Sequence, residues 1–166
     1  ITAYYPLGTA FISMNLNDQY LSDVNVRKAI SLAINREELV DAVLNGAGIP
    51  ATSYLNNGIP GHDDSLSVYE YNPEKAKELL AEAGIETPYD LGEMLVAEKY
   101  SNIATVLQSD LAAVGLNVTI AVKEFNSYIG DLTSGNYGIT ALEMTLDGDT
   151  QMLEMAFTSD YIGTAN

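Results

Sequence analysis

The amino-acid sequence predicts an α/β fold in which helices pack on a mixed sheet. Segments with the apolar pattern of strands alternate along the chain with segments of helical period. Several of the helical segments begin at a capping residue and end at a glycine. The 166 residues are 47% hydrophobic, which is enough to bury a substantial core. We therefore expect residues 1–166 to form a single α/β domain.

The first predicted strand covers residues 9–16, which are apolar enough to be mostly buried. An apolar stripe with helical spacing then runs over residues 24–34. Asn35 and Glu38 form a capping-box pattern, in which the Asn side chain accepts a backbone N–H at the helix start and the Glu side chain reaches back. A second helix therefore begins directly after Asn35 and ends at Gly46, a residue suited to the left-handed C-cap.

A long irregular segment is predicted for residues 48–71. It is rich in Gly, Pro, Asn, Asp and Ser and shows no sustained period. Irregular segments of this length usually have a function, so we expect one here. The next helix starts with Asn72 as its cap and Pro73 at its first position, and it ends before Gly84.

The second half of the chain repeats the alternation of strand and helix. The predicted elements are a strand at 91–97, a helix at 101–114, a strand at 118–122, a short helix ending at 132, a strand at 137–142 and a helical segment at 150–157. Asn126 is the predicted cap of the short helix, because Asn side chains often accept the first backbone N–H groups of a helix.

The charge distribution argues against some partners and favours others. The chain carries 7 basic and 23 acidic residues, and this net charge of −16 argues against nucleic acids and anionic membranes as partners. Every basic residue lies at or before Lys123, so residues 124–166 contain only acidic charges and would favour cationic ligand groups. The sequence has no apolar run of about 18 residues that could span a membrane, and its two ends look cut.

The sequence lacks the common signatures of enzymes and metal sites. His62 is the only histidine and the chain has no cysteine. A typical zinc site needs several His or Cys ligands, and a single histidine in a polar loop gives little support for a histidine-based triad. The stretch from Asp147 to Asp149 opens like a calcium loop, but Met152 and Thr158 stand where that loop requires Gly and Glu. We therefore expect no catalytic residues, no metal site and no cofactor.

A set of short motifs follows a fixed order along nearly the whole chain. They are residues 23–30, 33–37, 46–48, 50–51, 60–61, 71–84 and 111–118, together with Phe11, Asn15, Val43 and Gly58. This ordered set resembles the extracytoplasmic substrate-binding proteins of ABC importers, family 5, the oligopeptide- and dipeptide-binding type.

The resemblance implies a type II periplasmic-binding-protein-like lobe and a non-catalytic function. Members of this family close two lobes over a solute, so the resemblance implies that residues 1–166 are the C-terminal lobe of a longer protein. The implied partners are a small peptide, the N-terminal lobe of the same protein and the ABC permease in the membrane. The implied location is extracytoplasmic, either the periplasm or the surface of a Gram-positive cell as a lipoprotein.

The resemblance also indicates where the ligand binds. In the family, the loop after the strand matching 137–142 supplies an aspartate that pairs with the amino terminus of the peptide, a charge-assisted hydrogen bond. Here Thr145 stands at that position, and Asp147 or Asp149 could take over the role. The predicted ligand-binding residues are Asn15, Glu143, Met144, Thr145, Asp147 and Asp149.

Alternatives remain open at this point. The altered aspartate loop also suits a binding protein for a nickel chelate or an oligosaccharide, and the lobe could instead serve a sensory protein. Asn15 could be a hydrogen-bonding residue at a strand end, and Asp147 and Asp149 could be ordinary turn residues. Arg27 is expected to pair with a carboxylate and stabilise the lobe.

Overall fold

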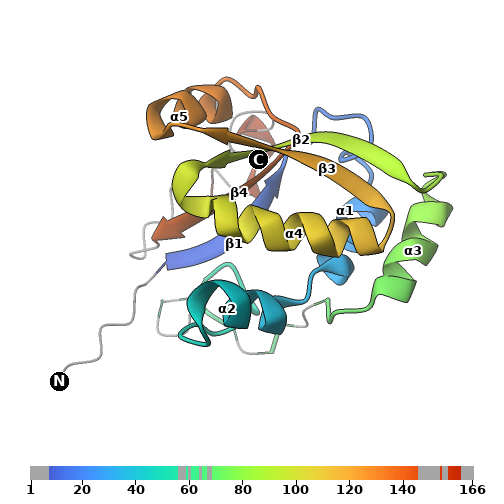
Figure 1. The fold of residues 1–166 in the computed structure, drawn as a ribbon, viewed down its shortest axis with the longest axis horizontal. Coiled ribbons are helices and arrows are strands. Elements are labelled where there is room, and N and C mark those ends of the chain that lie inside the picture. Colours follow the sequence, from blue (N-terminus) through green and yellow to red (C-terminus); the bar gives the residue numbers. More distant parts are fainter. Residues whose placement is uncertain are drawn as a thin grey trace.

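The computed structural model describes residues 8–55, 59, 61–63, 65–66, 69–145, 154 and 157–161 (Figure 1). The elements in chain order are β1 (Gly8–Met14), α1 (Val24–Ala33), α2 (Arg36–Leu44), α3 (Pro73–Glu82), β2 (Tyr89–Ala97), the 3-10 helix η1 (Glu98–Tyr100), α4 (Ser101–Ala113), β3 (Leu116–Lys123), α5 (Phe125–Thr133), β4 (Ile139–Thr145) and the 3-10 helix η2 (Ser159–Tyr161). The predicted order of strands and helices is confirmed up to β4.

The sheet is mixed, as predicted, and its strand order is β1-β4-β2-β3. The strand β2 runs parallel to both β3 and β4, and β1 runs antiparallel to β4. Parallel strands end at the same edge of a sheet. We call this the carboxyl edge: it comprises the ends of β2, β3 and β4 and the beginning of β1, and it lies toward the left of Figure 1.

The hydrophobic core lies between this sheet and the helices. The last four residues of β2, from Met94 to Ala97, are all buried, so both faces of this central strand are covered. Helix α4 packs on β2 and β3, α1 packs against α3 and α4, and α5 packs against β2. In Figure 1, α4 crosses in front of the sheet and α3 stands beside the start of β2. No helix of the described part of the chain is long and apolar enough to cross a membrane.

The helix caps agree with the sequence at some ends and differ at others. The Asn35 side chain accepts the N–H of Glu38, as predicted, but the backbone N–H of Asn35 donates to Asp110 of α4 instead of to Glu38. The predicted cap of α5 at Asn126 is wrong. Glu124 caps this helix, because its carboxylate accepts the N–H groups of Asn126 and of the next residue.

Two further expectations are corrected by the fold. The last strand was expected at 137–142, but it runs to Thr145 because β1 continues to pair with it as far as Gly8. Arg27 was expected to pair with a carboxylate. Its guanidinium instead donates to the backbone carbonyls of Leu21 and Ser22, each at 2.8 Å, and so fixes the turn before α1. Most of the predicted helical segment 150–157 lies outside the described residues.

Candidate functional site

The carboxyl edge is the place where an α/β sheet of this kind binds ligands. In open parallel sheets, ligands bind beyond the carboxyl ends of the strands, where successive connections leave a strand in opposite directions. Here β2 lies between β3 and β4, so the chain passes to one side of β2 after α4 and to the other side after α5. This switch in strand order places η1, the start of α5 and the end of β4 around one position.

A cation lies over aromatic rings at this edge. The ammonium of Lys99 in η1 is 4.5 Å from the ring centre of Tyr100 and 5.9 Å from that of Phe125, at the start of α5. The side chain of Lys99 is exposed, whereas Tyr100 is only 5% exposed. A hydrogen bond with Tyr100, together with the nearby carboxylate of Glu143, raises the pKa of Lys99. Lys99 is therefore a firmly charged cation on a rigid aromatic support.

Tyr100 also joins this cation to the end of β4. The backbone N–H of Glu143 donates to the Tyr100 hydroxyl at 3.2 Å. The Glu143 side chain is exposed and lies over Gly8 of β1, so closely that a Cβ atom on Gly8 would meet its carboxylate. No carboxylate of the described residues lies within ion-pair distance of the Lys99 ammonium.

The other predicted residues near β4 are placed as follows. Met144 accepts a hydrogen bond at its sulfur from the Tyr54 hydroxyl, at 3.3 Å. Thr145 pairs with Gly8 in the last position of the β1–β4 ladder. Asp147 and Asp149 lie outside the described residues, so the role of either carboxylate stays a prediction.

Asn15 lies at the opposite edge of the sheet, just beyond the end of β1. Its side chain is buried, with its amide nitrogen donating to the carbonyls of Gly135 and Tyr137 at 3.1 and 2.9 Å. Its amide oxygen accepts the N–H of Asn17 at 3.0 Å. These contacts are those of a hydrogen-bonding residue at a strand end, and the structure does not bring Asn15 together with Glu143.

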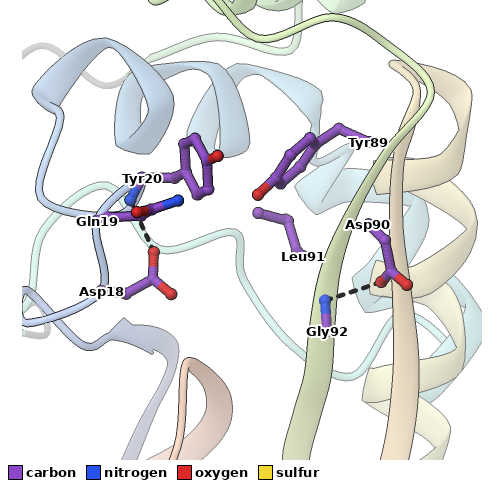
Figure 2. Close-up of a pocket in the computed structure, with 7 residues that line it drawn as sticks. All are labelled: Asp18, Gln19, Tyr20, Tyr89, Asp90, Leu91 and Gly92. Atoms are coloured by element: carbon purple, nitrogen blue, oxygen red, sulfur yellow. Dashed lines mark hydrogen bonds between the residues drawn. The ribbon is translucent and has the colours of Figure 1, made fainter.

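Two surface hollows in the described part of the chain lie away from the carboxyl edge. One, of about 290 Å³, lies between the turn after β1 and the start of β2 (Figure 2). Its walls include the rings of Tyr20 and Tyr89, whose centres are 4.8 Å apart. Burial, with a hydrogen bond that Tyr89 donates to Tyr20, raises the pKa of Tyr89 to about 12. The other hollow, of about 410 Å³, lies between α4 and β3.

The carboxylates of the first hollow have local structural roles. Asp18 accepts the backbone N–H groups of Tyr20 and Leu21, and Asp90 accepts the N–H of Gly92 (Figure 2). Hydrogen bonds of an Asp side chain to backbone N–H groups two or three residues further on stabilise turns. No group of three or more His, Cys, Asp or Glu side chains that could hold a metal ion occurs among the residues with described structure.

Lys99 and Tyr100 were missed by the sequence analysis. The signal that could have found them is their position directly after the predicted strand 91–97. The carboxyl ends of parallel strands converge at one edge, so charged and aromatic residues just after such a strand are candidates for ligand contact.

Comparison with known proteins gives one family. The profile of the family described as bacterial extracellular solute-binding proteins, family 5 middle, matches residues 2–164. The dipeptide-binding protein of Escherichia coli is 33% identical to this chain over 160 residues, which are 93% of this chain and 28% of that protein. The chain therefore spans less than a third of the length of this relative.

Two solved structures are similar to this fold. The periplasmic binding protein DppA from Helicobacter pylori, in complex with a peptide, matches with a TM-score of 0.86 and 25% identity over 96% of this chain and 32% of that chain. NikA from Staphylococcus aureus, in complex with a nickel–histidine complex, matches with a TM-score of 0.81 and 25% identity over 97% of this chain and 36% of that chain. Together with the mixed sheet, these similarities confirm the predicted type II periplasmic-binding-protein-like fold.

Proposed function

We propose that this chain, which belongs to the bacterial extracellular solute-binding proteins of family 5, is the ligand-binding lobe of a peptide-capturing protein. The observation that carries this proposal is the pair of opposite charges at the carboxyl edge. Tyr100 contacts both residues, because the Lys99 ammonium lies over its ring and its hydroxyl accepts the backbone N–H of Glu143.

This arrangement suits a zwitterionic ligand. A peptide with free ends carries an ammonium and a carboxylate, so Glu143, with the predicted Asp147 or Asp149, would take the amine, and Lys99 would take the carboxylate. Hydrogen bonds to charged groups contribute about 1.5–3 kcal/mol each when they are shielded from water. The ring of Phe125 is 52% exposed and offers apolar contact to varied peptide side chains.

The remaining contacts would come from a second lobe. The charged groups of the carboxyl edge are exposed in this lobe, and charge pairs in water are weak. Closure of an N-terminal lobe of the same protein over this edge would exclude water and strengthen them. Residues 1–166 are thus the C-terminal lobe in our proposal, working outside the cytoplasm, in the periplasm or on the cell surface. The closed protein delivers its peptide to an ABC permease, and it catalyses no reaction.

Calorimetry of the complete two-lobed protein tests the proposal. A peptide with free ends should bind, and its N-acetylated and C-amidated forms should bind at least about tenfold more weakly, a loss of about 1.4 kcal/mol for each. Equal affinity for the free and the acetylated peptides would contradict an acidic amine site.

Substitution of Lys99 tests the carboxylate contact. The Lys99→Met variant should weaken binding of the free peptide about tenfold or more, yet it should bind the C-amidated form as the unchanged protein does. Lys77→Met is the matched control, because Lys77 is a half-exposed cation of α3 that pairs with Glu74. Full retention of the preference for a free carboxylate in Lys99→Met would show that another group binds it.

A nickel chelate is the second candidate ligand. It is favoured by the similarity to NikA and by Thr145, which stands at the family's aspartate position. A small chelate can be bound through its own charged and polar groups without metal ligands from the protein. Titration of the complete protein with a nickel–histidine complex decides between the two: binding of the chelate without binding of any peptide would replace the peptide proposal.

A further inference from the structure

The end of β4, which carries Glu143 and Met144, is only partly held by the sheet. On one side β4 pairs with β1 along its whole length, from Ile139 to Thr145. On the other side its pairing with β2 covers only two positions, Ile139 and Thr140. Beyond Thr140 it is therefore one strand of a two-stranded ribbon, and such a ribbon is marginally stable on its own. Other contacts must fix its direction.

Tyr54, from the long segment after α2, supplies several of these contacts. Its hydroxyl donates to the Met144 sulfur at 3.3 Å, and its ring packs edge-on against Phe11 of β1 with ring centres 5.1 Å apart. The Tyr54 carbonyl accepts the Thr9 hydroxyl at 3.3 Å. Thr9 is the register partner of Met144, and directly opposed residues share one face of a sheet. Tyr54 thus covers that face where the ribbon projects.

The same ring contacts Phe157, which lies twelve positions after Thr145, the last residue of β4. The Tyr54 and Phe157 ring centres are 5.1 Å apart, at an interplanar angle of 81°. Met144 and Phe157 stand on either side of the sequence that contains Asp147 and Asp149. One side chain therefore contacts the chain both before and after this sequence. Fixing the two ends of a chain segment reduces the conformational entropy that it loses when it binds a ligand.

We propose that Tyr54 is a positioning residue for the ligand site. Tyr54 holds the end of β4 through Met144 and the facing residues of β1, and it thereby fixes the position of Glu143, the neighbour of Met144. The inference rests on the proposed binding function. It assigns no ligand contact to Tyr54 itself, and it gives the long segment 48–71, in which a function was expected, the task of supporting the site.

The Tyr54→Phe substitution in the complete protein tests this role, since it deletes only the hydroxyl and keeps the ring. Hydrogen exchange should become faster in β4 after Thr140, and peptide affinity should fall about three- to tenfold, as expected for one hydrogen bond. Tyr71→Phe is the matched control, because Tyr71 is 48% exposed. It should change neither exchange nor affinity.

A double-mutant cycle with Met144→Leu identifies the contact. Met144→Leu should weaken binding by a similar factor, and adding Tyr54→Phe should cause little further loss, because both variants remove the same hydrogen bond. Additive losses would overturn the Tyr54–Met144 coupling.

The two readouts separate this proposal from the proposed function. Faster exchange with unchanged affinity would reduce Tyr54 to a structural residue and overturn the positioning role. Unchanged hydrogen exchange would show that Tyr54 does not hold the end of β4. If the unchanged protein bound no peptide, the proposed function would fail, while the exchange experiment would still decide whether Tyr54 holds the end of β4.

Discussion

At the scale of single residues, the structure shows carboxylates of similar sequence context in different environments. Asp131 pairs with Lys123, and hydrogen bonds from Lys123 and Asn136 lower the pKa of its carboxyl. Asp110 instead accepts one backbone N–H from Asn35 at a partly buried corner between α2 and α4, and desolvation raises its pKa. A buried corner thus destabilises a negative charge even where the charge has a hydrogen-bond partner.

Asp110 gives a prediction about pH. Because its pKa is higher in the folded than in the unfolded chain, its contribution to stability is fully present below the unfolded pKa and is lost as pH rises through the folded pKa. Asp110→Asn keeps the acceptor and removes the charge. We expect this variant to gain stability relative to the unchanged chain as pH rises above the ordinary aspartate pKa of about 3.9, measured by urea unfolding at a series of pH values. A difference independent of pH would show that the pKa of Asp110 is not raised.

At the scale of elements, the helix α5 shows how a cap is chosen by the tertiary structure. Asn126 is the better capping residue by type, but Glu124 holds the position, with its carboxylate 2.9 Å from the N–H of Asn126 and 3.4 Å from that of Ser127. The helix starts one residue after Glu124, because β3 ends at Lys123 and the chain must turn there. A negative group at this position also interacts favourably with the positive end of the helix dipole.

The cap gives a prediction about stability. Glu124→Ala should lower the free energy of unfolding by about 1 kcal/mol, because it leaves two backbone N–H groups without their acceptor. Asn126→Ala should cost only about a few tenths of a kcal/mol, because its side chain donates a hydrogen bond to the exposed Glu124 carboxylate. Urea unfolding of both variants checks this. An equal or larger cost for Asn126→Ala would restore the cap predicted from the sequence.

At the scale of the whole molecule, the carboxyl edge is an exposed surface in the part of the chain that the structure describes. The two hollows lie away from Lys99 and Glu143, and the charged groups of the carboxyl edge face solvent. A binding protein normally buries most of the surface of a small ligand. The proposed function therefore needs a second surface.

The open edge gives a prediction about the isolated lobe. Residues 1–166 alone should bind a peptide at least about 100-fold more weakly than the complete protein, a loss of about 2.7 kcal/mol, because the second lobe supplies the other contacts and excludes water. Calorimetry of both proteins with one peptide measures the difference. Tight binding by the 166 residues alone would contradict capture between two lobes.

Much of the fold could be predicted from the sequence because it depends on local signals. Asn35, Asn72 and Pro73 mark helix starts through hydrogen bonds and backbone geometry that act within a few residues. The apolar periods identify the strands and the helix faces. The resemblance that extends through these scaffold motifs identified the family, which the comparisons confirm.

The candidate site was predicted less well because it depends on contacts between distant segments. Glu143 and Met144 were expected in a loop, and only the pairing with β1 extends β4 to include them. Lys99 joins the site because β2 lies beside β4, and Tyr54 joins it from 90 positions away in sequence.

The sequence by itself thus determined the order of the elements, the mixed α/β class and the family, since period, caps and motif order are local properties of the chain. Only the tertiary structure decided which residues lie at the carboxyl edge and which carboxylates have hydrogen-bond or ion-pair partners. The physical reason is that strand pairing and burial bring together groups whose separation in sequence carries no signal of their contact.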